Sequence, residues 1–219
     1  MALSLWYMSK TGPMHKYKIR YILLLLFAFT LISIHAQKNG YSQGYIINSE
    51  GEIIEGQVKD RSSGTFFELY KRIRFKPDNT PFKKKYSPDE ILGYGLNDQH
   101  FESVPLYEET AFFKFRYYIH ESYDRVFLKV VASNDDLTYF HWEYVDSDSN
   151  YLDYTPLFYR NGSDEMVRVT QGILGLKRKR LIEYFLDCPA LVQAIEKKKL
   201  NEIYEVYDFY LERCIRDIK

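Results

Sequence analysis

Cysteine and histidine are scarce in this chain. Its 219 residues include two cysteines and five histidines. Both cysteines, Cys188 and Cys214, follow Glu143, whereas every histidine precedes it. A structural zinc site needs four Cys or His ligands, and two sulfurs with no histidine nearby in the sequence are too few for one. We therefore expect no metal or other cofactor.

An excess of positive charge is also lacking. The chain has 30 basic and 30 acidic residues. Residues 1–36 hold four of the bases and none of the acids, so the remainder has 26 bases and 30 acids, a net charge of about −4. Nucleic-acid binding requires a surplus of Lys and Arg on one face. We expect no nucleic-acid partner.

Proline and glycine contribute only seven and eleven residues, which excludes a collagen-like or linker-dominated chain. Hydrophobic residues make up 46% and aromatic residues 17% of the sequence, which excludes a disordered protein. A chain of this length folds as one domain or two small ones and buries roughly 70% of the surface that its unfolded form exposes.

The sequence motifs of several enzyme classes are missing. The chain has no G-x-S-x-G elbow, no S-x-x-K and no glycine-rich phosphate loop. Asp146, Asp148 and Asn150 imitate the first half of a calcium loop, but Tyr151 replaces its required glycine and Leu157 its glutamate. We predict no catalytic residue from these patterns, although paired carboxylates leave little trace in a sequence.

The N-terminal segment has the order of a secretory signal. An uncharged apolar run from Tyr21 to Ile34 follows three basic residues and precedes His35-Ala36-Gln37. Fourteen helical residues cover about 21 Å, less than the roughly 30 Å hydrocarbon core, so we expect no permanent membrane span. The predicted signal peptide covers residues 1–36, with cleavage after Ala36 and Met14 as an alternative start. An uncleaved anchor or a buried core segment is the alternative for the apolar run.

Residues 37–172 are predicted to form an antiparallel, β-rich body. Apolar and polar side chains alternate along residues 112–119 with the period of two that half-buried strands show. Asn161-Gly162, between two further strand patterns, is a strong hairpin signal. Repeated hairpins predict an antiparallel sheet, open or partly rolled.

Residues 173–219 are predicted to form a three-helix segment packed on that body, which gives an α+β fold. Residues 176–186 fit a first helix, Pro189 suits the start of a second and Asn201 suits the cap of a third. One face of the third helix would carry four side chains at spacings of four, three and four, namely Ile203, Tyr207, Tyr210 and Cys214.

Cys188 and Cys214 are predicted to form a structural disulfide. An exported chain meets an oxidising compartment in which a cysteine pair persists as a disulfide. The bridge would close a loop of about 26 residues and stabilise the fold by about 3 kcal/mol. Two buried free thiols are the alternative.

His141 and Glu143 are a weak candidate polar pair. They lie two apart on a predicted strand, so both project from the face opposite Trp142, with a spacing of nearly 7 Å. Such a pair could hold a metal or act as acid and base. An ordinary solvated face is the alternative.

Four consecutive bases form a basic patch, Lys177, Arg178, Lys179 and Arg180. The start of a helix disfavours cations, so an anionic partner such as a lipid phosphate would explain the run. A solvated helix face is the alternative.

Tyrosine is abundant, with 21 residues. Strand alternation places Tyr118 and Tyr139 on outer faces, where amphipathic rings suit contacts with sugars or proteins. The alternative is that such tyrosines complete the packing of a modest sheet.

Four segments follow one another along the chain and read YIINSEGEIIEGQV, YSPDEILGYGL, FLKVVASNDDLTYFHW and LIEYFLDCPALVQAI, with Cys214 beyond. In that order they resemble a group of exported proteins of Bacteroidota whose role is uncharacterised. The first turn of that group often reads G-D-T-I, whereas this chain has Glu50 to Ile53 there. The resemblance implies a Gram-negative envelope setting and carries over no catalytic residue.

These observations predict an exported protein, periplasmic or extracellular or peripheral to the outer membrane. Its expected role is that of a non-catalytic binding or structural component of the cell envelope, with an envelope protein or glycan as partner. The alternative is a periplasmic hydrolase that acts on envelope glycans or esters with strand-borne carboxylates or His141.

Overall fold

The computed structural model describes residues 40–62, 68–112 and 114–215. The predicted signal peptide, its cleavage site after Ala36 and the alternative start at Met14 lie outside the described residues. Within the described part, no helix is long and apolar enough to cross a membrane.

Strands account for most of the regular structure. They are β1 (Ser42–Ile47), β2 (Ile53–Arg61), β3 (Leu69–Pro77), β4 (Lys84–Tyr86), β5 (Gly93–Leu96), β6 (Gln99–Ala111), β7 (Lys114–Ile119), β8 (Arg125–Ser133), β9 (Leu137–Val145), β10 (Leu152–Arg160) and β11 (Glu165–Arg168). The helical elements are the 3-10 turn η1 (Gly172–Leu174), α2 (Arg178–Tyr184), α3 (Pro189–Glu196), α4 (Ile203–Phe209) and the π-helical turn η2 (Tyr210–Cys214). The α+β class expected from the sequence is confirmed.

The strands form one antiparallel sheet in the order β4-β3-β2-β1-β5-β6-β7-β11-β10-β9-β8, and part of it closes on itself. Closure depends on the 13-residue strand β6. Its residues 99–102 pair with β5, residues 100–105 with β8 and residues 106–111 with β7. The sequence predicted an open or partly rolled sheet; the β6–β8 pairing instead closes a six-stranded barrel.

Side chains fill the barrel interior, as expected for a small barrel. Alternate positions of its strands point inward, so the period of two in residues 112–119 corresponds to inward Phe115, Tyr117 and Ile119. Each fully buried apolar side chain contributes about 1.5–3 kcal/mol. The buried interior residues are Leu106, Tyr117, Leu128, Phe140, Leu157 and Met166.

The first five strands have a separate apolar cluster, which extends to Phe101 of β6. Its buried members are Ile46, Val58, Ile73, Phe75, Ile91, Tyr94, Leu96 and Phe101. Strands β1 and β5 approach closely here. A Cβ at Gly44 would lie 2.1 Å from the backbone carbonyl oxygen of Gly95, so this position requires glycine.

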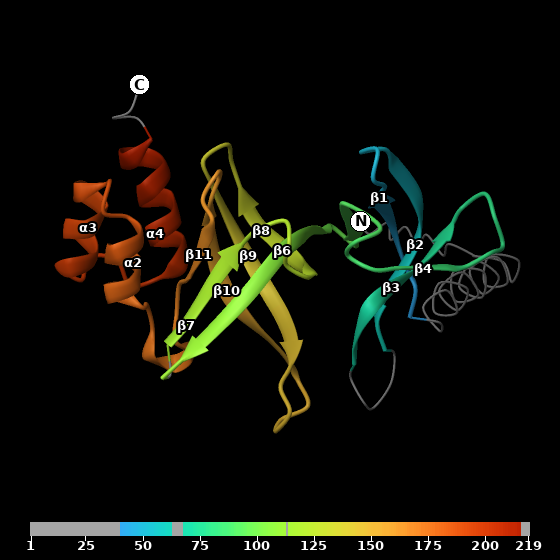
Figure 1. The fold of residues 1–219 in the computed structure, drawn as a ribbon, viewed down its shortest axis with the longest axis horizontal. Coiled ribbons are helices and arrows are strands. Elements are labelled where there is room, and N and C mark those ends of the chain that lie inside the picture. Colours follow the sequence, from blue (N-terminus) through green and yellow to red (C-terminus); the bar gives the residue numbers. More distant parts are fainter. Residues whose placement is uncertain (1–39, 63–67, 113, 216–219) are drawn as a thin grey trace, which may run out of the picture. The chain divides into compact units, whose positions relative to one another are not determined.

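Helices α2, α3 and α4 pack on the outer face of β9, β10 and β11 (Figure 1). Leu137, Phe158 and Val167 from the strands meet an apolar helical face that includes Leu181 and Leu191. This third cluster is the largest of the described part of the chain. It explains why a seven-residue helix such as α2 is stable, since short helices depend on tertiary packing.

The predicted disulfide is present. Cys188 and Cys214 are bonded, with their Cα atoms 5.5 Å apart and a separation of 26 positions in the sequence. Both are buried in the helical cluster. Cys188 immediately precedes α3 and Cys214 ends η2, so the bond fastens the start of the second helix to the end of the last one.

The predicted cap of the last helix is wrong by one residue. Glu202, not Asn201, precedes α4 and forms a reciprocal capping box with Glu205. The Oδ1 atom of Asn201 instead accepts a hydrogen bond of 3.0 Å from Arg178. A contact with Arg178, 23 positions earlier in the sequence, therefore outweighs the local capping preference of asparagine.

Candidate functional site

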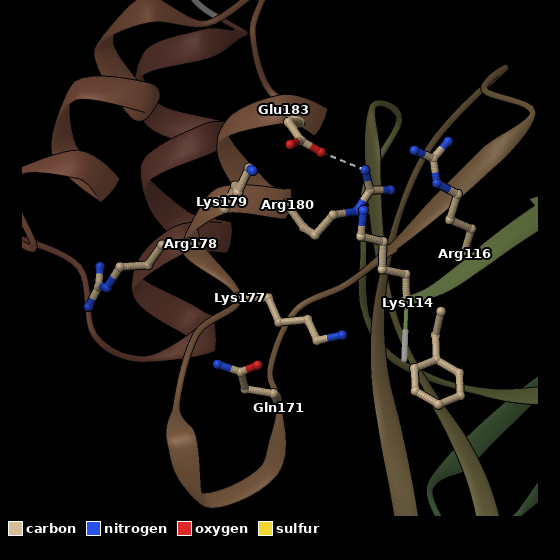
Figure 2. A pocket seen from close by; sticks show the side chains of 9 residues that line it. Lys114, Arg116, Gln171, Lys177, Arg178, Lys179, Arg180 and Glu183 are labelled. Carbon is tan, nitrogen blue, oxygen red and sulfur yellow. Dashed lines mark hydrogen bonds and ion pairs between the residues drawn. The ribbon is translucent and has the colours of Figure 1, made fainter. Parts of the chain in front are cut away.

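A basic cavity lies between β7 and the segment that leads into α2. Its volume is about 330 Å³, which is at the lower end of the range for ligand pockets. Figure 2 shows cationic side chains from both segments around it. We call it the basic cavity; it is lined by Lys114, Phe115, Arg116, Gln171, Lys177, Arg178, Lys179, Arg180 and Glu183.

Strand pairing brings the two walls together. Strand β11 pairs with β7, with Glu165 opposite Tyr118 and Met166 opposite Tyr117. The chain then loops through η1 and returns to the residues that follow β11. Thr170 forms an isolated β-bridge with Leu176, and the amide of Lys177 donates a hydrogen bond to the carbonyl of Val169. Lys177 is thereby fixed beside β7, with its Nζ atom 5.9 Å from the centre of the Phe115 ring.

The four bases of the predicted basic patch have different roles. Arg178 donates to the carbonyls of Ile195 and Leu200, at 3.2 and 2.7 Å, and points away from Lys114 and Arg116 (Figure 2). It therefore fastens α2 to the end of α3. The alternative interpretation, a solvated helix face, is wrong for Arg178, whereas Lys179 is exposed.

Arg180 has carboxylate partners of its own. Its guanidinium lies 2.5 Å from Glu165 and 2.7 Å from Glu183. Two acidic side chains thus neutralise this arginine at the edge of the basic cavity. Arg180 is therefore already held in place by its own partners when a ligand enters the basic cavity.

Three lysines of the basic cavity lack such partners. Among the described residues, no ion pair involves Lys114, Lys177 or Lys179. Burial lowers the pKa of Lys177, and the positive charges of Arg168 and Arg180 lower it further. A bound anion would relieve this repulsion, because an opposite charge favours the charged form of a lysine.

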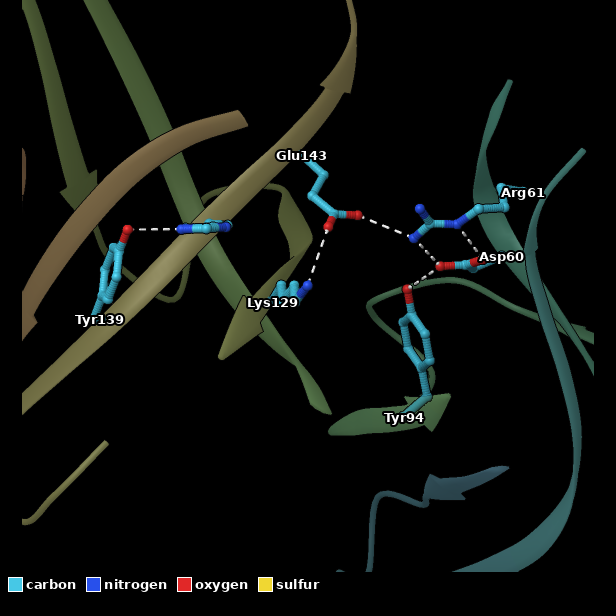
Figure 3. Close-up of polar contacts among 7 residues, drawn as sticks. Asp60, Arg61, Tyr94, Lys129, Tyr139 and Glu143 are labelled. Atoms are coloured by element: carbon cyan, nitrogen blue, oxygen red, sulfur yellow. Dashed lines mark hydrogen bonds and ion pairs between the residues drawn. The ribbon is translucent and has the colours of Figure 1, made fainter. Parts of the chain in front are cut away.

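His141 and Glu143 do not form a pair. The Nε2 atom of His141 lies 2.7 Å from the Tyr139 hydroxyl, and its ring stacks on Tyr154 with a centroid distance of 3.8 Å. Glu143 instead contacts Arg61 and Lys129, at 3.0 and 3.9 Å (Figure 3). The solvated alternative is also wrong for Glu143, whose side chain is only 11% exposed.

The environment of His141 disfavours its charged form. Burial lowers the pKa of its imidazole to about 4, and the positive charge of Lys129 contributes. His141 is thus neutral at pH 7, with one nitrogen engaged by Tyr139. The described residues contain no group of three or more His, Cys, Asp or Glu side chains that could hold a metal ion.

A partly buried ionic network, which the sequence did not reveal, joins β2 to β9. Arg61 contacts Asp60 at 2.7 Å and Glu143 at 3.0 Å. The Tyr94 hydroxyl donates to Asp60 at 3.2 Å, and burial, reinforced by the charge of Asp60, raises the pKa of Tyr94. Only the polar Lys59-Asp60-Arg61 run at the end of an otherwise alternating strand could have signalled it.

This network borders a second cavity of about 630 Å³. Tyr94, Phe127 and Trp142 give it aromatic walls, and Asp60 and Glu143 lie in its lining. Arg61 donates to both carboxylates, so their oxygens are already engaged within the protein. We assign this arrangement a structural role.

The tyrosines expected on outer faces are differently placed. Tyr139 is 2% exposed and packs against Phe158 and Tyr204, so the expectation is wrong there because helices cover that face. Tyr118 is half-buried, and its hydroxyl donates to Glu109 at 3.3 Å.

No protein-family description, no curated protein and no solved structure matches this chain.

Proposed function

We propose that this protein is an exported, non-catalytic binding component of the cell envelope whose basic cavity recognises an anionic group such as a phosphate ester. The observation that carries the proposal is the convergence of Lys114, Lys177 and Lys179 on one cavity without carboxylate partners. Like charges held together cost free energy, and an anionic ligand would recover it.

The chemistry of the basic cavity suits a phosphate ester. Lysine ammonium groups bind phosphate as point charges with several donors. The ring of Phe115 adds an apolar wall, against which the organic part of an ester could pack. The volume of about 330 Å³ accommodates one such headgroup.

An envelope location is supported by two features. The basic, apolar and small-residue order of residues 1–36 is typical of a secretory signal. The disulfide between Cys188 and Cys214 is typical of oxidising compartments. The resemblance to exported proteins of Bacteroidota points the same way, and together these features favour an envelope ligand.

The alternative proposal is a hydrolase that acts on envelope glycans or esters. It would rest on His141 or on carboxylates such as Glu143. Because both side chains already have partners within the protein, we place binding first.

Calorimetric titration with glycerol 1-phosphate at low salt tests the proposal. The double variant Lys114→Gln, Lys177→Gln removes two unpaired charges from the basic cavity. Each charge-assisted hydrogen bond contributes about 1.5 kcal/mol or more, so we expect roughly tenfold weaker binding per lysine. Lys199→Gln, an exposed position after α3, is the matched control. Equal affinity in all three proteins would refute the assignment.

A further inference from the structure

Two large apolar side chains project into solvent on the segments that lead into the two walls of the basic cavity. Phe112, at the tip of the β6–β7 hairpin, is 96% exposed, and Leu174, at the end of η1, is 73% exposed. Phe112 also has a positive φ of 46°, an uncommon conformation for a bulky residue. Neither side chain contributes to an apolar cluster of the fold.

These two side chains are close in sequence to two of the unpaired lysines. Phe112 is two residues before Lys114, and Leu174 is three residues before Lys177. Both lysines line the same cavity. Each segment that lines the cavity therefore carries a lysine and, within three residues of it in the sequence, an exposed apolar side chain.

We propose that this face docks on an anionic lipid surface, with Phe112 and Leu174 entering the interfacial region and the basic cavity taking a lipid phosphate. The inference rests on the proposed anion binding and identifies a membrane lipid as the source of the anion. Peripheral membrane proteins combine inserted apolar side chains with basic residues. The apolar side chains anchor the protein in the interfacial region, and the basic residues attract it to anionic headgroups.

A lipid surface accounts for more of the observed features than other anionic ligands do. A free phosphate ester would use the lysines but would give no role to the exposed Phe112 and Leu174. An acidic protein would need a broader polar contact around the apolar core of its interface. Charge complementarity and two isolated apolar tips fit a bilayer interface.

Co-sedimentation of the protein with vesicles tests the inference. We expect binding to vesicles that contain phosphatidylglycerol, weaker binding to phosphatidylcholine vesicles and a loss of binding at high salt. The variant Phe112→Ser, Leu174→Ser should bind anionic vesicles about tenfold more weakly or worse. Tyr151→Ser, which replaces an exposed aromatic residue in an acidic turn, is the matched control and should bind like the parent.

Measuring the binding of both ligands by the same variants distinguishes this inference from the proposed function. Phe112→Ser, Leu174→Ser should retain its affinity for glycerol 1-phosphate, whereas Lys114→Gln, Lys177→Gln should lose both ligands. A parent protein that binds the soluble ester but no vesicle, or vesicle binding that is unchanged in Phe112→Ser, Leu174→Ser, would overturn the docking inference alone. Failure to bind either ligand would overturn both. Circular dichroism of each variant checks that the fold is retained.

Discussion

The guanidinium of Arg61 on β2 donates to the carboxylate of Glu143 on β9 at 3.0 Å, across 82 residues of sequence. Arg61 also holds Asp60, whose side chain is only 4% exposed. Burial opposes the charge of Arg61, but the hydrogen bonds and charges of Asp60 and Glu143 outweigh it and raise its pKa. Two strands from different parts of the sheet are thus joined by mutually dependent charges.

Arg61→Met should destabilise the protein by about 1–3 kcal/mol, because it leaves the buried carboxylate of Asp60 and the largely buried carboxylate of Glu143 without their guanidinium. Glu143→Gln should cost less, since Arg61 keeps Asp60. Urea unfolding of the single and double variants gives the coupling free energy between Arg61 and Glu143. A coupling of zero would show that the 3.0 Å contact contributes nothing to stability.

Replacing both cysteines, as Cys188→Ser with Cys214→Ser, should lower the free energy of unfolding by about 3 kcal/mol. The physical reason is that the bond restricts the unfolded chain over 26 residues. Reductant should shift the urea midpoint of the parent protein in the same direction and leave the variant unchanged. If the parent unfolds identically with and without reductant, the disulfide does not stabilise this fold.

Stability should depend on pH through His141. Its pKa is about 4 in the folded protein, against the ordinary value of 6.5. Between these values the unfolded chain binds a proton that the folded protein excludes, so stability is full above pH 6.5 and decreases as the pH falls toward 4. The loss amounts to about 3 kcal/mol at most.

Thermal unfolding across this pH range measures the effect. His141→Gln should flatten the pH dependence, whereas His120→Gln, at an exposed turn, should leave it intact. An equal slope in the His141 variant and the parent would contradict the assigned cause.

Anion binding should weaken at high pH because of Lys177. Burial and the charges of Arg168 and Arg180 lower its pKa below the ordinary value of 10.5. A bound phosphate favours the ammonium form, so affinity is full below the lowered pKa and decreases as the pH rises through it. Titration of Lys177→Arg, which stays charged, should show no such loss; a loss equal to that of the parent would exclude Lys177 as its source.

Local features of the fold were predictable from the sequence. The hairpin at Asn161-Gly162 follows from a turn that needs positive φ, and Gly162 has a φ of 83°. The inward position of Cys214 follows from a helical face on which Tyr207, Tyr210 and Cys214 are all buried. These signals depend on neighbours a few residues apart.

Features that depend on distant pairings were not predictable. Closure of the barrel requires β6 and β8 to meet, and a period of two indicates strands without indicating their partners. The ionic network of Arg61 and the covering of Tyr139 by helices also depend on contacts between segments that are distant in the sequence. Likewise the basic patch was visible as Lys177 to Arg180, but its cavity exists because β11 places that run beside Lys114 of β7.

The most direct test of anion recognition is a titration of the ¹⁵N-labelled protein with glycerol 1-phosphate, followed by amide chemical shifts. We predict saturable shifts that concentrate in residues 114–116 and 171–183, which line the basic cavity, and that vanish in Lys114→Gln, Lys177→Gln. Shifts that are absent, or that centre on another part of the chain, would contradict the account.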